Sequence, residues 1–336
     1  MNGVIIVDKP AGWTSHDVVA RMRRILGQRS IGHLGTLDPL ATGVLPLVVG
    51  NLTRLAQFYT ASEKTYEGVI RFGFATNTYD ADGDPLDEVR PVTLNPVVLK
   101  LDQLQQLATG FLGLIEQLPP PFSAKKINGV PAYKLARKQQ EVVLRPVQVE
   151  IKEFVILSVA EDRAHFRARV ASGTYMRSVA HEMGQLLGCG AHLESLRRTA
   201  VAEFDISQAH TLEEINLHCH SDPNTSCHSD RSFPFSKGKE SGVEEPAFPD
   251  IIMSLFIHPR QLLPHFPCVA ADEFTVARIR SGRPVNLPEV SRARYVKVFQ
   301  GQSELIAIAS RVAGTLFHPK IVLVNEQAVA VAKGKE

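Results

Sequence analysis

The sequence predicts an α+β protein with a mixed, largely antiparallel central sheet flanked by helices. Strand-like and helix-like segments follow one another without the regular strand–helix–strand rhythm of a parallel sheet. Thr65–Phe74 alternates between apolar and polar residues, which indicates a strand with one buried face. Several short strand-like runs between Phe266 and Asn325 predict an additional small β-rich module.

The N-terminal region is predicted to begin with a strand and a helix. Val4–Val7 is a short apolar run that ends in a turn, as expected of a buried strand. A helix is expected through Asp17–Leu26, with Thr14 or Ser15 as its N-cap and its end near Gly27. Hydroxyl side chains satisfy the free N–H groups of a first turn, and glycine readily ends a helix.

The other elements are predicted from the same patterns. Apolar residues recur at helical spacing in Asp102–Leu112 and Ser178–Leu187. Pro249–Leu263 is predicted as a helix interrupted at His258-Pro259. The remaining predicted strands are Val44–Val49, Val147–Ser158, His165–Ala171, Tyr295–Phe299, Leu305–Ala309 and Ile321–Val324.

Composition sets broad limits on the protein class. The chain has 336 residues, 44% of them hydrophobic, which is enough for one large and one small domain. The net charge of +2 does not by itself indicate nucleic-acid binding. The first ten residues lack the features of a signal peptide, and no apolar run reaches the length of a membrane span. The four scattered cysteines, Cys189, Cys219, Cys227 and Cys268, do not suggest a disulfide framework. A cytoplasmic location is expected.

The segment 218–246 differs from the rest of the chain. It is rich in Ser, Asp, His, Pro and Lys, and Cys219-His220-Ser221-Asp222 recurs as Cys227-His228-Ser229-Asp230. Adjacent Cys and His residues can bind metal, but this spacing matches no zinc-finger pattern. We predict a disordered low-complexity insertion and no metal site.

One carboxylate, Asp38, stands out within the run Gly32–Leu47. It lies among glycines and aliphatic residues, and Pro39 directs it to an extended or turn conformation. Gly32, Gly35 and Gly43 allow a close approach of the backbone to another group. Such an acid is either a turn cap or a reactive group. The residue types alone favour the turn cap.

Five segments in order resemble the bacterial tRNA pseudouridine synthase B (TruB) family. The run Gly32–Leu47 matches the family's GHxGxLDPxATGxLP pattern without a gap, and the resemblance covers roughly residues 1–217. It implies the pseudouridine synthase fold, followed by a PUA-like RNA-binding module. The other matching segments are Lys64–Gly68, Pro119–Gly129 with Tyr133 and Ala136-Arg137, Gly173–Arg177, and Gly188–Arg198.

The resemblance also implies roles for individual residues. Asp38 would act on the ribose, with Arg177 as its counter-ion, and Tyr66 would stack on the flipped base and assist proton removal at C5. Tyr175 and Leu196 would line the uracil pocket. Taken alone, Tyr66 and Leu196 fit core positions, and Arg177 fits a surface arginine. The other predicted substrate-binding residues are His33, Lys64 and Lys125.

Basic residues gather in three places. The acid-free segment 117–140 contains Lys125, Lys126, Lys134, Arg137 and Lys138. The segment 275–300 contains Arg278, Arg280, Arg283, Arg292, Arg294 and Lys297 with Glu289 as its one acid. A helix face carries Arg21, Arg23 and Arg24. Each cluster could be a solvated face, but together they favour contacts with RNA phosphates.

The predicted function is isomerisation of uridine to pseudouridine at position 55 in the T-loop of tRNA. The reaction gains or loses no atom, so no cofactor or metal is expected, and Asp38 either attacks C1′ or abstracts a proton. The predicted partner is the T-arm stem-loop, bound by a monomer. One alternative is a tRNA-binding or tRNA-folding protein with secondary or lost catalysis. Another is a synthase guided by a separate RNA, which the Pro119–Gly129 segment disfavours.

The predicted domain organisation follows from the resemblance and the change in composition. Residues 1–217 form the catalytic domain, which continues in 247–265, and 218–246 are the insertion. Residues 266–326 form the PUA-like module, and 327–336 are a tail.

Overall fold

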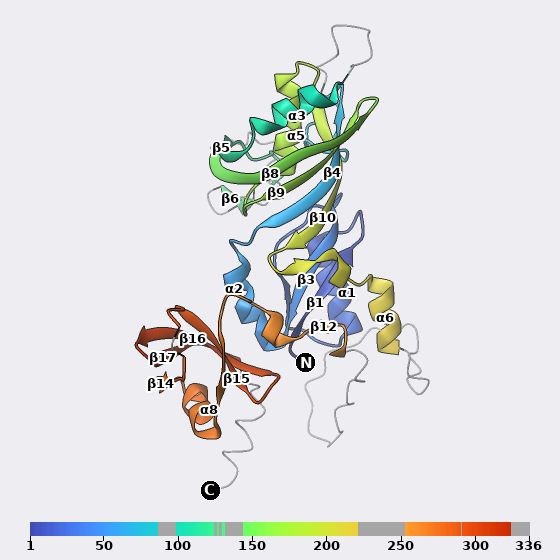
Figure 1. Cartoon of the computed structure of the whole chain (residues 1–336). Coiled ribbons are helices and arrows are strands. Elements are labelled where there is room, and N and C mark those ends of the chain that lie inside the picture. Colours follow the sequence, from blue (N-terminus) through green and yellow to red (C-terminus); the bar gives the residue numbers. More distant parts are fainter. Residues whose placement is uncertain are drawn as a thin grey trace.

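The computed structural model describes residues 1–86, 99–123, 126–127, 130–131, 144–220, 253–289 and 291–323. Within these ranges the chain forms a ten-stranded sheet, a five-stranded sheet and a two-stranded hairpin of β6 (Lys126–Ile127) and β7 (Val130–Pro131). Figure 1 shows the larger sheet running through the upper and middle part of the molecule, with the smaller sheet at one end.

The larger sheet is mixed and largely antiparallel, as predicted. Its order is β12-β1-β3-β10-β4-β9-β8-β5, with β2 paired to β3 and β11 paired to β10. The pairing of β3 with β10 is parallel, and the other pairings in this sheet are antiparallel. In chain order the strands are β1 (Gly3–Lys9), β2 (Ile31–His33), β3 (Thr42–Val49), β4 (Lys64–Phe72), β5 (Gly113–Gln117), β8 (Val147–Ala160), β9 (Arg163–Val170), β10 (Ala191–Val201), β11 (Phe204–Asp205) and β12 (Phe256–Ile257).

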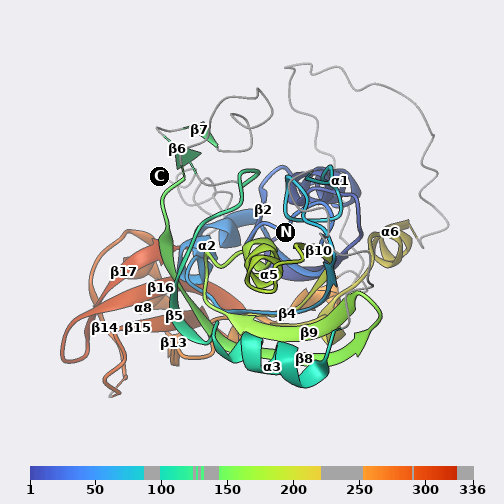
Figure 2. The same cartoon turned by 90° about the horizontal axis from the view of Figure 1, so that it is seen from above.

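Helices lie between the strands in the chain, and some of them begin with a capping side chain. The helix α1 (Ser15–Ile25) begins with a capping box, in which Thr14 and Asp17 satisfy each other's backbone N–H groups. Figure 2 shows α5 (Met176–Leu186) within the curve formed by β4, β9 and β8. The other helical segments are η1 (Gly50–Leu55), α2 (Ala56–Tyr59), α3 (Leu101–Thr109), η3 (Ile206–Gln208), α6 (Leu212–His220) and η4 (Pro259–Gln261).

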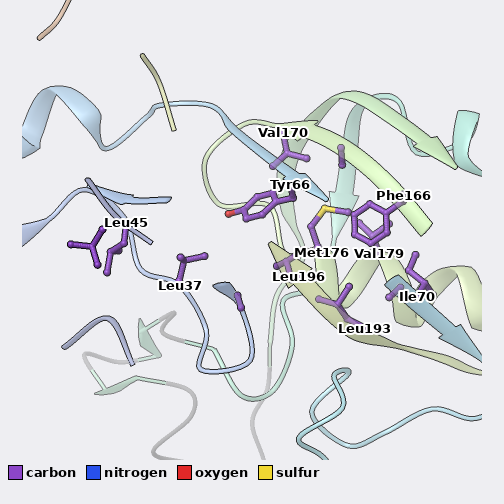
Figure 3. Packing of buried hydrophobic residues seen from close by; sticks show 14 of the residues in the cluster. Leu37, Leu45, Tyr66, Ile70, Phe166, Val170, Met176, Val179, Leu193 and Leu196 are labelled. Atoms are coloured by element: carbon purple, nitrogen blue, oxygen red, sulfur yellow. The ribbon is translucent and has the colours of Figure 1, made fainter. Parts of the chain in front are cut away.

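The main hydrophobic core lies between α5, α3 and one face of the larger sheet. Alternate residues of β4 enter it, as the sequence period of two predicts: Tyr66, Ile70 and Phe72 are all buried. Figure 3 shows Ile70, Phe166 and Val179 packed together in this cluster. The core therefore fixes β4, which carries Tyr66, against α5, which carries Arg177.

The C-terminal part forms the predicted β-rich module. Its order is β13-β15-β16-β17-β14, and α8 (Glu273–Arg280) follows β13. The strands are β13 (Cys268–Ala271), β14 (Val285–Asn286), β15 (Tyr295–Gln300), β16 (Glu304–Ala313) and β17 (Leu316–Val322).

A shared core joins this module to the larger sheet. It contains Val4 and Val201 from the larger sheet together with Phe299 and Ile308 from the module. A polar contact at the same boundary supports it. Tyr59 donates its hydroxyl hydrogen to Glu203 across 2.6 Å, and the Leu263 N–H donates to the same carboxylate across 2.8 Å.

One predicted helix does not extend as far as expected, and other elements were missed. Within Pro249–Leu263, the described part is α-helical at Met253, and β12 and η4 follow where the helix was expected to continue. Phe256 instead pairs with Ile5 of β1, a contact that local periodicity does not reveal. The helix α8 and the long strand β10 had not been predicted. The segment 218–246 lies almost wholly outside the described residues. No helix that the structure describes is long and apolar enough to cross a membrane.

Candidate active site

A cavity of about 430 Å³ brings together most of the residues singled out in the sequence. It lies between the loop after β2, the start of β4, the turn before α5 and the middle of β10. Six of the eight predicted site residues line it: Asp38, Lys64, Tyr66, Tyr175, Arg177 and Leu196. These residues come from four separate stretches of the chain.

Asp38 stands at the rim of this cavity on a backbone held by several hydrogen bonds. Its carbonyl accepts from the Ala41 N–H across 3.1 Å, and the carbonyl of Pro39 accepts from the Gly12 N–H across 2.9 Å. The side chain is 40% exposed, so the carboxylate is less buried than its apolar sequence neighbours suggest. The loop thus presents an open carboxylate on a fixed backbone.

Gly43 closes this loop where β3 meets β10. Its φ is +98°, and a Cβ placed there would lie 2.2 Å from the carbonyl oxygen of Arg198. A side chain would clash with that backbone, so glycine is required. The close approach predicted for this glycine is therefore made by strand β10.

Arg177 pairs with Asp38 from the first turn of α5. Its Nε donates to Oδ2 of Asp38 across 2.9 Å, and its side chain is 5% exposed. Its two remaining guanidinium nitrogens donate to the carbonyls of Thr78 at 3.1 Å and Phe122 at 3.0 Å. The planar guanidinium group thus donates to three acceptors at once, which fixes its orientation.

A second carboxylate, Asp80, was missed by sequence reasoning. Its Oδ2 lies 3.5 Å from Nη1 of Arg177, and the residue is 5% exposed. Burial raises the pKa of Asp80, while hydrogen bonding from Thr78 and the charge of Arg177 oppose that rise. Arg177 therefore lies between two carboxylates, one buried and one open to the cavity.

Tyr66 and Leu196 lie on neighbouring strands. In the β4–β10 register Gly68 is opposite Leu196, and Tyr66 is opposite Arg198. Figure 3 shows the Tyr66 ring near Leu196 and Met176, with its hydroxyl pointing away from Phe166. Both side chains belong to the hydrophobic core and also line the cavity. The core and binding interpretations of these residues are therefore compatible.

Arg198 also lines the cavity, and the sequence did not reveal that it is buried. It is fully buried and donates to the carbonyls of Val44, Thr36 and Gly35 at 2.8, 3.3 and 3.1 Å. Burial lowers the pKa of Arg198, and the neighbouring Tyr66 and Asp38 oppose that shift. The strand period of two from Leu196 could have indicated this inward position.

Tyr175 and Lys64 complete the cavity wall. The Gln117 amide exchanges two hydrogen bonds with the Tyr175 backbone, at 2.8 and 3.1 Å, and so fixes the turn before α5. Burial raises the pKa of the Tyr175 hydroxyl. Burial first, and the charge of Arg198 second, lower the pKa of Lys64 to about 8. The cavity carries three basic side chains beside Asp38.

Two predicted site residues lie elsewhere. His33 does not line the cavity. It contacts His16 edge-on, with ring centroids 5.7 Å apart, and accepts a hydrogen bond from the Gly35 N–H at 3.3 Å. Burial lowers the pKa of His33, which favours the neutral ring. Lys125 lies outside the described residues.

The described residues contain no group of three or more His, Cys, Asp or Glu side chains placed to hold a metal ion. The described side chains that line the cavity include the carboxylate of Asp38, the phenols of Tyr66 and Tyr175, and basic groups. A carboxylate beside a fixed arginine can stabilise positive charge that develops on a sugar carbon.

Comparison with known proteins identifies the family. Residues 23–176 match the family described as "TruB family pseudouridylate synthase (N terminal domain)", and residues 177–227 match "tRNA pseudouridylate synthase B C-terminal domain". A protein of Solibacter usitatus named "tRNA pseudouridine synthase B" is 45% identical over 326 residues, covering 96% of this chain and all of that protein. The chain belongs to the TruB family. A TruB protein of Stutzerimonas stutzeri is 35% identical over 310 residues, covering 92% of this chain and 91% of that one.

Solved structures show that the fold extends beyond close TruB relatives. A chain in a Cbf5-Nop10-Gar1 complex aligns with a TM-score of 0.65 at 24% identity, covering 97% of this chain and 86% of the other. A chain of an H/ACA RNP bound to a substrate RNA aligns with the same TM-score at 22% identity, covering 96% and 85%. At these identities the likeness shows the pseudouridine synthase fold. As a member of the TruB family, the chain is an isomerase that acts on uridine in RNA.

Proposed function

We propose that this chain isomerises the uridine at position 55 in the T-loop of tRNA, with Asp38 as the essential acid. The tRNA substrate follows from the names of its TruB relatives, and the T-loop position from the resemblance of the sequence motifs. The observation that carries the role of Asp38 is its 2.9 Å hydrogen bond from buried Arg177. This contact orients one carboxylate at the cavity and places a fixed positive charge beside it.

The reaction breaks the N1–C1′ bond and joins C5 to C1′ of the same nucleotide. The uracil turns between these steps, the proton on C5 leaves, and N1 gains a proton, so the atoms balance without a cofactor. Cleavage leaves positive character on the ribose, which the Asp38 carboxylate stabilises either by bonding to C1′ or by taking a proton from the sugar. Both routes use the Asp38 carboxylate, which the hydrogen bond from Arg177 orients.

The remaining cavity residues suit a flipped nucleotide. A uridine that leaves the T-loop stack loses stacking energy, which contact with the Tyr66 ring offsets. Tyr175 and Leu196 would enclose the uracil, and Tyr66 would assist removal of the C5 proton. Lys64 would bind a backbone phosphate. Lys125 stays a predicted substrate contact, and His33 would act indirectly through the Gly35 backbone.

Release of tritium from tRNA labelled at uracil C5 tests the role of Asp38. Asp38→Asn is expected to abolish release while leaving tRNA affinity nearly unchanged. Arg177 keeps its contacts with Asp80, Thr78 and Phe122 in that variant, so the fold should persist. Asp162→Asn, which removes a carboxylate paired with Arg71 and Arg163 at the surface, is the matched control. Full activity of Asp38→Asn would refute the assignment.

The proposal extends to the whole chain. Residues 1–217 with 247–265 would form the catalytic unit, and the 266–326 module would add contacts to tRNA through its arginines. We propose that the protein acts as a cytoplasmic monomer. Mapping of pseudouridine in cognate tRNA, with and without the protein, tests the position. Wild-type binding without any pseudouridine would instead favour a tRNA-folding protein.

A further inference from the structure

A second hollow lies beside the turn that precedes α1. It has a volume of about 1000 Å³ and lies between α1, α6 and the turn at Pro10–Thr14. We call it the Trp13 groove. It shares no lining residue with the catalytic cavity. Figures 1 and 2 show α1 and α6 side by side at this edge of the molecule.

Two arginines of α1 give the Trp13 groove a free positive charge. Arg21 and Arg24 are exposed, line the groove and form no hydrogen bond or ion pair with any residue that the structure describes. This distinguishes them from Arg23 on the same helix, which donates to the Ile31 carbonyl at 3.0 Å. Arg21 and Arg24 lie three residues apart on α1, and neither guanidinium group is engaged with a described residue. Two such groups can bind the phosphates of a nucleic-acid backbone.

Two carboxylates also line the Trp13 groove and limit where an anion can lie. Asp17 is engaged in the capping box, where it accepts from the backbone and hydroxyl of Thr14 at 2.9 and 2.7 Å. Glu213 stands on the opposite wall, at the start of α6. A phosphate chain is therefore favoured along the part of α1 that carries Arg21 and Arg24, and disfavoured beside Asp17 and Glu213.

An aromatic side chain completes the Trp13 groove. Trp13, the one tryptophan of the chain, is 38% exposed. An exposed indole beside two free arginines is the combination that binds unpaired nucleotides, because the base stacks on the ring while phosphates meet the cations.

The Trp13 groove is connected to the catalytic loop through backbone contacts. Buried Lys9 donates to the carbonyls of Trp13 at 2.6 Å and Pro39 at 3.2 Å. Gly12 N–H donates to the same Pro39 carbonyl at 2.9 Å. Pro39 directly follows Asp38, so the turn that forms one groove wall also supports the catalytic carboxylate.

We infer that the Trp13 groove binds a single-stranded segment of the substrate RNA outside the nucleotide that enters the catalytic cavity. Arg21 and Arg24 contact its phosphates, and Trp13 stacks on one of its bases. This inference rests on the proposed function, since it takes the bound RNA to be the tRNA substrate.

Intrinsic fluorescence provides a direct test, because Trp13 is the one tryptophan in the protein. Titration of the full chain with unmodified tRNA transcript is expected to quench Trp13 emission. Arg21→Gln/Arg24→Gln should raise the Kd for tRNA about tenfold and reduce the slope of log Kd against log salt concentration by roughly 1.5. Glu213→Gln should change the Kd in the opposite direction and tighten binding.

The control removes two cations elsewhere. Arg163→Gln/Arg167→Gln deletes the same charge from the outer face of β9, where both arginines are paired with glutamates. Its Kd and salt slope should match those of the wild type. An unchanged Kd and slope in Arg21→Gln/Arg24→Gln, with no quenching of Trp13, would overturn the inference. Quenching by a poly-glutamate peptide but not by tRNA would also overturn it, in favour of an acidic protein partner.

These results separate the two proposals. Groove binding is read from fluorescence and from the salt dependence of Kd, neither of which requires catalysis. Trp13 quenching without pseudouridine formation would leave the groove assignment standing and remove the proposed function. Pseudouridine formation with neither quenching of Trp13 nor altered tRNA affinity would leave the proposed function standing and overturn the groove assignment.

Discussion

Arg177 and Asp38 meet through a single 2.9 Å hydrogen bond, although 139 positions separate them in the chain. The two side chains differ sharply in exposure, at 5% for the arginine and 40% for the carboxylate. The arginine is therefore the buried, fixed member of the pair, and the carboxylate is the member open to the cavity. This asymmetry lets Arg177 orient Asp38 without blocking it.

Arg177→Lys is expected to reduce kcat at least about 100-fold, because a lysine cannot replace three fixed donors and a shift of about 1 Å at a reacting group has that effect. Single-turnover pseudouridine formation at saturating tRNA measures it. Arg163→Lys, at a surface pair with Glu194, is the control and should leave kcat unchanged. Wild-type kcat in Arg177→Lys would show that its hydrogen-bond geometry is dispensable.

Asp80→Asn tests the second carboxylate. The amide can still accept from Thr78, whose hydroxyl donates to Oδ1 at 2.5 Å, but it no longer attracts Arg177 by charge. Arg177 would then be held less firmly, and Asp38 would be oriented less precisely. We therefore expect kcat to fall about tenfold, the effect of losing a residue that orients a reacting group. The Km for tRNA should change little. Asp82→Asn in the same loop is the control, and equal kcat values for both variants would contradict a role for Asp80.

The sequence predicts those parts of the fold and site that depend on local pattern. Alternation in β4 predicts the inward positions of Tyr66 and Ile70, and hydroxyl capping predicts the start of α1. The ordered motifs lead to six residues of one cavity although nothing in their spacing shows that they meet. The order of the motifs therefore identified residues that meet through long-range contacts, which periodicity alone does not reveal.

The residues that sequence reasoning missed acquire their roles through long-range contacts. Arg198 follows Arg197 directly, yet Arg197 faces outward to Asp8 while Arg198 is buried beneath the cavity. Asp80 resembles an ordinary loop acid until Arg177 is placed beside it. Residues 256–257 form a strand because β1 offers an edge, and a short apolar run does not by itself distinguish strand from helix.

Lys9→Met tests the support beneath the catalytic loop. Lys9 is fully buried and donates to three carbonyls, those of Pro10, Trp13 and Pro39. Methionine matches its length but leaves these acceptors unpaired, so we expect a loss of about 3 kcal/mol in the free energy of unfolding. Urea denaturation followed by circular dichroism measures it. Lys152→Met, at a surface pair with Glu63, is the control, and equal stability of both variants would contradict the prediction.

Lys64 is expected to make tRNA binding sensitive to pH. Burial in the cavity and the charge of Arg198 lower the pKa of Lys64 from 10.5 to about 8, so this lysine loses its proton as the pH rises through 8. If its ammonium group binds a phosphate, the Km for tRNA should rise about threefold between pH 7 and pH 9, the loss of one phosphate contact. Lys64→Arg keeps its charge over that range, so its Km should stay flat.

Lys9 complicates the interpretation of this profile, because burial lowers its pKa to about 8 as well. The two lysines can be separated by the parameter that each affects. Lys9 supports the Asp38 loop, so its deprotonation should appear in kcat and persist in Lys64→Arg. Lys64 lines the cavity, so its deprotonation should appear in Km and should have no counterpart in that variant. A Km that still rises with pH in Lys64→Arg would assign the pH dependence to another group.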